Sequence, residues 1–389
     1  MKRKLISVIF LLGSMCLVTG CWDSTELNEK HVVLDVAIDK NTEMNNGEDD
    51  SKVISEQNGY TVTYAIPDIA KLSGNDSLSD DVKTVLSVNS ASIGESIDKI
   101  EAQTQNTISF SHTKALILGE ELLKDSRLLK MAMNSFMENT EVGRATYLLA
   151  ARGKANEISS AESYQNPIIG LYVTKFFNNT ERAIGDCEEQ TLGNFNKEIK
   201  EYRVSTLPII SQNKEDSTLQ INNGAVIKDY SLVGWLDADE IRAKMLLDEK
   251  VKDLPIIVKI DNNDYMYQLQ SEECKINYRK QDGKLFIDIK IENTGKLTEY
   301  ALYDLTQDNG EVISRRVAQK VNKKLEQTIL AGIEKAQNLN ADFLHLSLDL
   351  YRKHPDIWKQ YETTWQENLY SGTEINISVN TIIEGLGMM

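Results

Sequence analysis

Residues 274–291 read CKINYRKQDGKLFIDIKI, and this stretch says more about the fold than any other in the chain. Apolar and polar side chains alternate on both sides of Asp282-Gly283, the residue pair that the type I′ turn of a two-residue β-hairpin favours. The pattern therefore predicts two antiparallel strands joined at this turn. Such a pair has one apolar face, which other elements of the chain must cover.

A helical pattern follows the hairpin. Apolar residues recur at every fourth position from Ile313 to Ile333, which predicts one long helix with a single apolar stripe. A further helix carries aromatic residues at spacings of three and four, so that they share one face. These residues are Trp358, Tyr361 and Trp365. A last strand is expected over residues 374–383.

The part of the chain before the hairpin alternates predicted strands and helices. The expected strands lie at 32–38, 60–66, 111–118, 145–151 and 223–236. The expected helices lie at 85–103, 122–136 and 238–247, with mostly helical signals between 154 and 201. These patterns predict an α+β protein of several domains, in which small mixed or antiparallel sheets pack against helices.

The domain limits follow from these shifts in pattern and from the length of the chain. We expect a signal peptide at 1–20, an N-terminal α+β domain at 21–153, a mostly helical middle region at 154–220 and a C-terminal α+β domain at 221–389.

The N-terminus has the order of a secretory signal, with basic residues 2–4 followed by a mostly apolar run over 5–18. That run is shorter than the roughly 20 residues that a membrane-spanning helix needs. It ends in VTGC at 18–21, which resembles a bacterial lipobox. We therefore expect cleavage between Gly20 and Cys21 and two acyl chains on Cys21, enough for stable anchoring. The alternative is an ordinary signal peptide or a signal anchor, in either of which Cys21 is incidental.

The chain is strongly acidic, with a formal net charge of −16. Cleavage before Cys21 would remove three basic residues and no acidic one, which makes the mature chain more negative still. Such a chain has no electrostatic route to nucleic acid phosphates, and anionic lipid headgroups would repel it. We therefore expect the lipid on Cys21 and protein partners to hold it at a membrane.

A search for chemical motifs finds none. There is no His-Glu-x-x-His, Gly-x-Ser-x-Gly or phosphate-binding loop, so we predict no enzyme activity, no metal and no cofactor. Residues 261–272 begin and end like a calcium loop, but Met266 stands where glycine is required. His112 is the best single candidate for a functional histidine, although a structural role is favoured, and the acidic pair Glu188-Glu189 is interpreted as solvated charge.

Three further features have two interpretations each. Cys187 and Cys274 form one disulfide or stay as two free thiols. The aromatic face of Trp358, Tyr361 and Trp365 packs on the terminal sheet or, where exposed, binds a partner, because aromatic residues dominate binding hot spots. The first half of the long helix carries a basic cluster, for which a solvated face is favoured over a lipid or partner patch. Its members are Arg315, Arg316, Lys320, Lys323 and Lys324.

Four segments, in this order, resemble the Ger(x)C family, the lipoprotein C subunits of spore germinant receptors. The first is Gly20-Cys21-Trp22-Asp23 with Glu26-Leu27-Asn28, and the second runs from Ser111-His112-Thr113-Lys114 to Gly119-Glu120-Glu121. The third is Asn223-Gly224-Ala225-Val226 with Leu232-Val233-Gly234-Trp235-Leu236. The fourth is Pro355-Asp356-Ile357-Trp358-Lys359 with Trp365, followed by residues 375–385.

The resemblance implies a non-enzymatic, multi-domain α+β subunit on the outer face of the spore inner membrane. It would be tethered by lipid on Cys21 and would act with integral A and B subunits in assembly and signalling of the nutrient response. The family supplies no catalytic residues, and whether the subunit contacts the nutrient stays open. The alternatives are a solute-binding lipoprotein of a transporter, which would need two α/β lobes around a cleft, and a lipid-anchored envelope enzyme.

Overall fold

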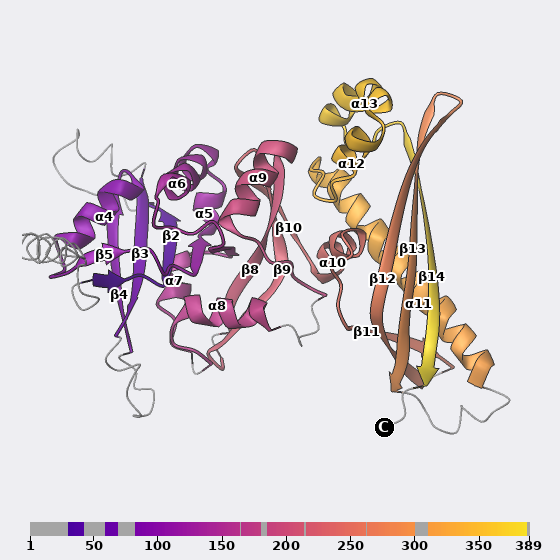
Figure 1. Cartoon of the computed structure of the whole chain (residues 1–389), viewed down its shortest axis with the longest axis horizontal. Helices are drawn as coiled ribbons and strands as arrows, with labels where there is room; N and C mark the ends of the chain where they lie inside the picture. The colour runs from indigo at the N-terminus through magenta and orange to yellow at the C-terminus, as the bar shows by residue number, and fades with distance from the viewer. Residues whose placement is uncertain are drawn as a thin grey trace, which may run out of the picture.

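The structure is a computed structural model that describes residues 30–42, 59–68, 82–163, 165–179, 185–213, 215–261, 263–299 and 310–386. The chain forms two halves that lie side by side along the long axis of the molecule, each around its own sheet (Figure 1). The predicted α+β class with several domains is confirmed.

The first half contains a mixed sheet of eight strands in the order β10-β9-β8-β7-β6-β2-β3-β4. The central strands β2, β6, β7 and β8 are parallel neighbours, and all outer pairs are antiparallel. The strands are β2 (Asp35–Lys40), β3 (Tyr60–Pro67), β4 (Lys83–Ser90), β6 (Ala115–Leu118), β7 (Tyr147–Ala151), β8 (Val204–Asn213), β9 (Thr218–Lys228) and β10 (Ser231–Leu236). A separate parallel pair is formed by β1 (Lys30–Val32) and β5 (Thr107–Ser109).

Helices cover both faces of this sheet because its central strands are apolar on both sides. Leu116 and Leu118 of β6 pack with one set of helices, whereas Ile117 packs with the other. The first set is α4 (Ile93–Glu101), α5 (Glu120–Leu123), α6 (Ser126–Glu138) and α9 (Leu192–Tyr202). The second set is α7 (Ala155–Ser159) and α8 (Ile169–Asn178).

Two buried carboxylates of β2 hold the second set of helices in place. Asp39 accepts hydrogen bonds from the backbone N–H groups of Ala155 and Asn156, at 2.7 and 2.9 Å, and so caps the start of α7. Asp35 accepts from the Ser159 hydroxyl at 2.5 Å and from the Gly170 N–H at 3.2 Å. Burial raises the pKa of Asp35 to about 6.

The prediction of one helix over 85–103 is wrong in its first third. Residues 83–90 form β4, which pairs antiparallel with β3, and the helix α4 begins only after Ser92. The Ser92 side chain accepts from the Glu95 N–H and marks the true start of the helix. Val88 stands at helical spacing from the apolar residues of α4, but the free edge of β3 offers it backbone pairing instead.

The second half contains four strands in the order β11-β12-β13-β14. The predicted hairpin is confirmed: Asp282 and Gly283 both have positive φ, 51° and 80°, as a type I′ turn requires. Only the last pair, β13 with β14, is parallel. The strands are β11 (Leu254–Ile260), β12 (Asn263–Gln281), β13 (Lys284–Glu299) and β14 (Thr373–Leu386).

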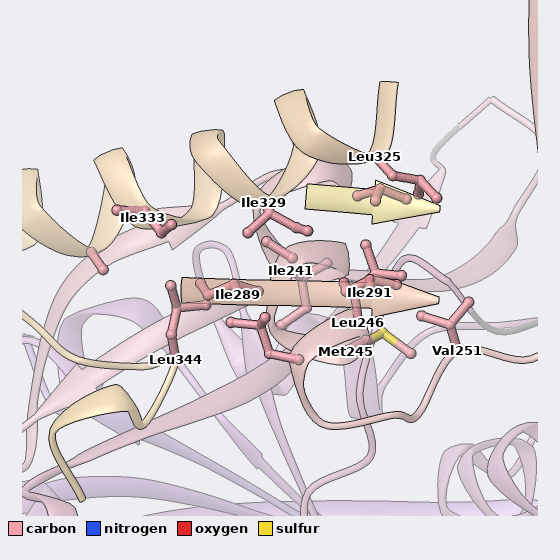
Figure 2. Packing of buried hydrophobic residues seen from close by; sticks show 14 of the residues in the cluster. Ile241, Met245, Leu246, Val251, Ile289, Ile291, Leu325, Ile329, Ile333 and Leu344 are labelled. Atoms are coloured by element: carbon pink, nitrogen blue, oxygen red, sulfur yellow. The ribbon is translucent and has the colours of Figure 1, made fainter. Parts of the chain in front are cut away.

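One face of this second sheet is covered by helices. The long helix α11 (Gly310–Leu339) follows the predicted stripe, and its Leu325, Ile329 and Ile333 point toward Ile289 and Ile291 of β13 (Figure 2). The helix α10 (Ala238–Leu247) begins at a capping box and packs against α11 in the same core. Two further helices, α12 (Leu346–Lys353) and α13 (Pro355–Glu367), lie near the hairpin tip (Figure 1).

The eight-stranded sheet takes strands from all three segments into which we divided the chain after residue 20. Residues 154–220 supply three helices and also β8, which joins β7 to β9 within this sheet. The domain limits at 153 and 220 stay predictions. Strands on both sides of each position belong to the same eight-stranded sheet.

Candidate functional site

The residues predicted for lipid attachment and cleavage, Gly20 and Cys21, lie outside the described residues. The predicted partner-binding residues all lie on α13, which begins with Pro355 at its first turn. Tyr361 and Trp365 are 9% and 2% exposed, so they belong to the core of the second half. Trp358 is half-buried and stacks edge-on against Trp365, with 5.8 Å between ring centroids.

Tyr361 and Trp365 are held in place by contacts within the second half. The Tyr361 hydroxyl donates to the Gly283 carbonyl at the hairpin tip, at 3.3 Å, and the Trp365 ring lies 5.2 Å from that of Tyr370. The aromatic face therefore packs mainly against its own sheet and the loop after α13. Of the three predicted residues, Trp358 is the one that a partner can reach, and partner binding by this face stays a prediction.

A cleft of about 620 Å³ lies in front of Trp358, between the two halves of the molecule. One wall comes from the end of α9 and the turn between β9 and β10, with Tyr202, Arg203 and Asp229. The opposite wall comes from α12 and α13, with Tyr351 and Glu362 as well as Trp358. Trp358 and Trp365 in the second wall were among the residues predicted from the sequence, whereas no residue of the first wall was.

The first wall of the cleft is formed where two segments of backbone turn through a left-handed residue. Arg203 adopts a left-handed conformation with φ of 61° and ends α9, and Asp229 does the same at the turn after β9. The Arg203 guanidinium binds the Asp229 carboxylate through two hydrogen bonds of 2.7 and 2.9 Å. This bidentate pair holds the two turns together at the edge of the cleft.

Asn340 and Asp342, which line the cleft, are hydrogen-bonded within the chain. Lys228 donates to the Asn340 carbonyl at 2.5 Å, and the Asn340 side chain accepts from the Leu369 N–H at 2.9 Å. Asp342 is buried and accepts from the Tyr370 hydroxyl at 2.5 Å and from the Ser347 N–H at 2.7 Å. These contacts occupy the polar groups of Asn340 and Asp342, whereas the buried Nε1 of Trp365, which also lines the cleft, has no hydrogen-bond partner among the described residues.

Beside the cleft, the two halves touch through an aromatic stack. The Tyr202 ring at the end of α9 lies 4.2 Å from the His345 ring, with only 18° between the planes. Burial, and next the nearby Lys244 ammonium, lower the pKa of His345 to about 3, so the imidazole is neutral. Its buried Nε2 has no hydrogen-bond partner, which is consistent with a structural stack.

A buried ion cluster joins the halves behind this stack. Lys244 of α10 is 1% exposed and donates to Glu188, in the loop before α9, at 2.6 Å and to Asp248 at 2.7 Å. Burial alone would lower the pKa of Lys244, but attraction to Glu188, Asp248 and Glu198 outweighs it and raises that pKa. Burial would likewise raise the pKa of Glu188, yet Lys244 and Lys250 lower it to about 2.

The interpretation of Glu188 as solvated charge is therefore wrong. Glu188 lies at the contact between the halves because Lys244 needs a counterion there. The sequence does hold a weak signal, since Lys244 sits three residues after the buried Ile241 and four before Asp248. Nothing in the sequence indicates that Glu188, far away along the chain, completes the cluster.

The structure also shows where the candidate histidine and the two remaining cysteines lie. His112 is exposed in the turn before β6. Cys187 is buried and Cys274 half-buried, and no disulfide joins them, which favours the interpretation as two thiols. In the part of the chain that the structure describes, no group of three or more His, Cys, Asp or Glu residues is arranged to hold a metal ion. None of the helices in those residues is long and apolar enough to cross a membrane.

Comparison with known proteins defines the class to which this fold and chain belong. Residues 23–212 match the family model of the spore germination protein N-terminal domain, and residues 222–387 match that described as spore germination B3/GerAC like, C-terminal. The chain belongs to this Ger(x)C family of germinant-receptor C subunits. It is not a known enzyme family, and the absence of enzyme activity stays a prediction.

Individual relatives match over almost their whole length. Spore germination protein KC of Bacillus subtilis (strain 168) is 21% identical, over 100% of this chain and 97% of the relative. Spore germination protein A3 of the same organism is 22% identical, over 98% of each chain. The crystal structure of the GerBC protein covers 90% of this chain and 97% of its own, with a TM-score of 0.58 and 19% identity, and supports the fold.

Proposed function

We propose that this chain is the lipid-tethered C subunit of a spore nutrient germinant receptor. It is held on the outer face of the spore inner membrane and acts in receptor assembly and signalling with the integral A and B subunits. The observation that carries the proposal is the family match, which runs in two segments from residue 23 to residue 387. It begins directly behind Cys21, the cysteine of the lipobox.

Charge and anchoring support the same function. The chain carries −16 overall, so an anionic membrane surface would repel its body. Two acyl chains on Cys21 overcome this repulsion, because a doubly acylated protein binds stably where a single chain binds only marginally. Contacts with integral subunits then fix which way the body faces.

The architecture favours this function over that of a solute-binding lipoprotein. That class closes two α/β lobes over its solute, whereas the second sheet here is antiparallel except for β13 and β14. A solute site also presents a few convergent polar groups. At the cleft between the halves, Asn340 and Asp342 are already bonded within the chain.

The tether is tested by replacing the lipidated cysteine. Cys21→Ala should abolish incorporation of labelled palmitate in sporulating cells and move the protein from the membrane to the soluble fraction. Cys187→Ala removes a buried thiol that is in no disulfide, and it should leave label and fractionation unchanged. Undiminished labelling of Cys21→Ala would contradict the tether.

The receptor role is tested in spores that lack the chain. They should lose or slow their response to at least one nutrient, and expression of the wild-type chain should restore it. Cys21→Ala, made at equal level, should restore it poorly, because the subunit no longer concentrates at the membrane. An unaltered response to every nutrient tested would argue against a receptor subunit.

A further inference from the structure

The cleft between the two halves has the chemistry of a docking groove. It is lined by four aromatic residues, Tyr202, Tyr351, Trp358 and Trp365. Trp365 is already sealed in the core, but Tyr351 is 52% exposed and Trp358 is half-buried. Exposed aromatic side chains at the mouth of a concave site are the residues that most often anchor a protein partner.

The charge at the cleft is acidic. Its lining carries four carboxylates, of Glu201, Asp229, Asp342 and Glu362, against the two cations Arg203 and Lys228. Arg203 is neutralised by Asp229, Glu201 pairs with Arg352 of α12 at 3.4 Å, and Lys228 is turned toward the Asn340 carbonyl. Glu362 is exposed beside Trp358 on α13 and has no ionic partner in the described part of the chain. The free charge at this site is therefore negative.

These groups suit a protein segment better than a small molecule. A small ligand would need several inward polar groups to orient it. Here the inward groups of Asn340 and Asp342 are occupied, and the accessible groups, Tyr351, Trp358 and Glu362, stand at the rim. Accessible groups at a rim can contact side chains that a partner protein inserts from solvent.

We infer that this cleft docks a segment of an integral receptor subunit in which an apolar or aromatic residue lies next to a Lys or Arg. The apolar residue packs between Tyr351 and Trp358, and the cation faces Glu362. The inference rests on the proposed function and adds to it the place on this chain where the integral partner is bound.

The experiment places the photo-crosslinking residue p-benzoylphenylalanine at Tyr351, in the full-length lipoprotein in its native membrane. The same residue at Met131, which is 43% exposed on α6 in the first half, is the matched control. The expected result is an adduct from position 351, mapped by mass spectrometry to an extracytoplasmic segment with Lys or Arg within a few residues. Position 131 should not label that segment.

A charge test follows in the same preparation. Glu362→Lys should reduce the adduct from position 351 at least fivefold, whereas Glu138→Lys, which makes the same charge change on exposed α6, should not. Equal effects of the two, or adducts only with lipid, with a second copy of this chain or with a segment lacking basic residues, overturn the inference.

The two proposals fail in distinguishable ways. If integral subunits co-purify with the wild-type chain but position 351 forms no adduct with them, the docking site is wrong and the receptor role stands. If no integral subunit co-purifies, the receptor role itself fails. Thermal unfolding of each variant at the wild-type temperature excludes loss of adduct through misfolding.

Discussion

The ammonium group of Lys244 lies at the contact between the halves and is 1% exposed, with the carboxylates of Glu188 and Asp248 as its partners. Lys244→Met leaves the buried Glu188 carboxylate and the half-buried Asp248 carboxylate without that cation. We expect a loss of about 3–5 kcal/mol in the free energy of unfolding, measured by urea titration.

The matched control for this change is Lys250→Met. Lys250 binds the same Glu188 but is 51% exposed, so its removal should cost less than about 1 kcal/mol. The double variant Lys244→Met with Glu188→Gln should recover part of the loss, because it leaves fewer uncompensated charges. Equal losses for the two lysine variants would refute the buried cluster as a distinct stabilising unit.

Glu272 gives a prediction about pH. Burial, followed by the neighbouring Glu249 charge, raises its pKa to about 8, against an ordinary value of 4.5. Between these pH values the folded chain keeps a proton that the unfolded chain has released, so this group makes stability fall as pH rises from 4.5 to 8.

Glu272→Gln should remove that slope. The decrease in the free energy of unfolding between pH 5 and pH 8 should shrink by about 3–4 kcal/mol, because each of these three pH units contributes about 1.4 kcal/mol while the folded carboxyl keeps its proton. Chemical denaturation at the two pH values measures it. Glu273→Gln, on the exposed face of the same strand, is the control and should leave the slope nearly as in wild type. An unchanged slope in Glu272→Gln would show that its carboxyl is ionised in the folded chain.

At the scale of elements, α11 supplies the apolar stripe that covers the second sheet. Ile329 is fully buried against that sheet, whereas its neighbour Leu330 is 47% exposed. Ile329→Ala should lower the free energy of unfolding by about 2–5 kcal/mol, because it removes buried methyl groups and leaves a cavity. Leu330→Ala should change it by less than about 1 kcal/mol. Similar losses for both would mean that the stripe faces elsewhere.

Elements set by local signals were predictable from the sequence. The hairpin was identified from Asp282-Gly283 and α11 from its four-residue apolar period, and the helix expected at 238–247 is α10. β4 was mistaken for helix because its pairing with β3 is a tertiary contact, and a single sequence does not reveal such contacts. The same limit hid the insertion of β8 between β7 and β9.

The candidate site follows the same division. The aromatic face of α13 could be predicted because Trp358, Tyr361 and Trp365 are spaced by three and four residues and so lie on one side of a helix. The opposite wall of the cleft, with Tyr202 and Asp229, comes from turns of the first half that meet α13 only in the folded chain. No local pattern could therefore have paired the two walls.

For the molecule as a whole, two halves with separate sheets meet at a contact that is both polar and apolar. The polar part contains the ion cluster, the Tyr202–His345 stack and the cleft. The apolar part consists of Val204, Val226 and Leu236 of the first sheet, which are buried in one cluster with α10 and the second sheet. An acidic body behind the proposed lipid anchor suits a subunit whose position is set by proteins and not by membrane charge.

The central claim is that this chain is a membrane-tethered subunit of a germinant receptor. The most direct measurement is affinity isolation of the tagged, full-length protein from detergent-solubilised spore inner membranes, with quantitative mass spectrometry and Cys21→Ala as the parallel sample. The account predicts that integral A and B subunits co-purify with the wild-type chain in near-stoichiometric amounts and fall sharply with Cys21→Ala. Recovery of the wild-type lipoprotein from that membrane without either integral subunit would contradict it.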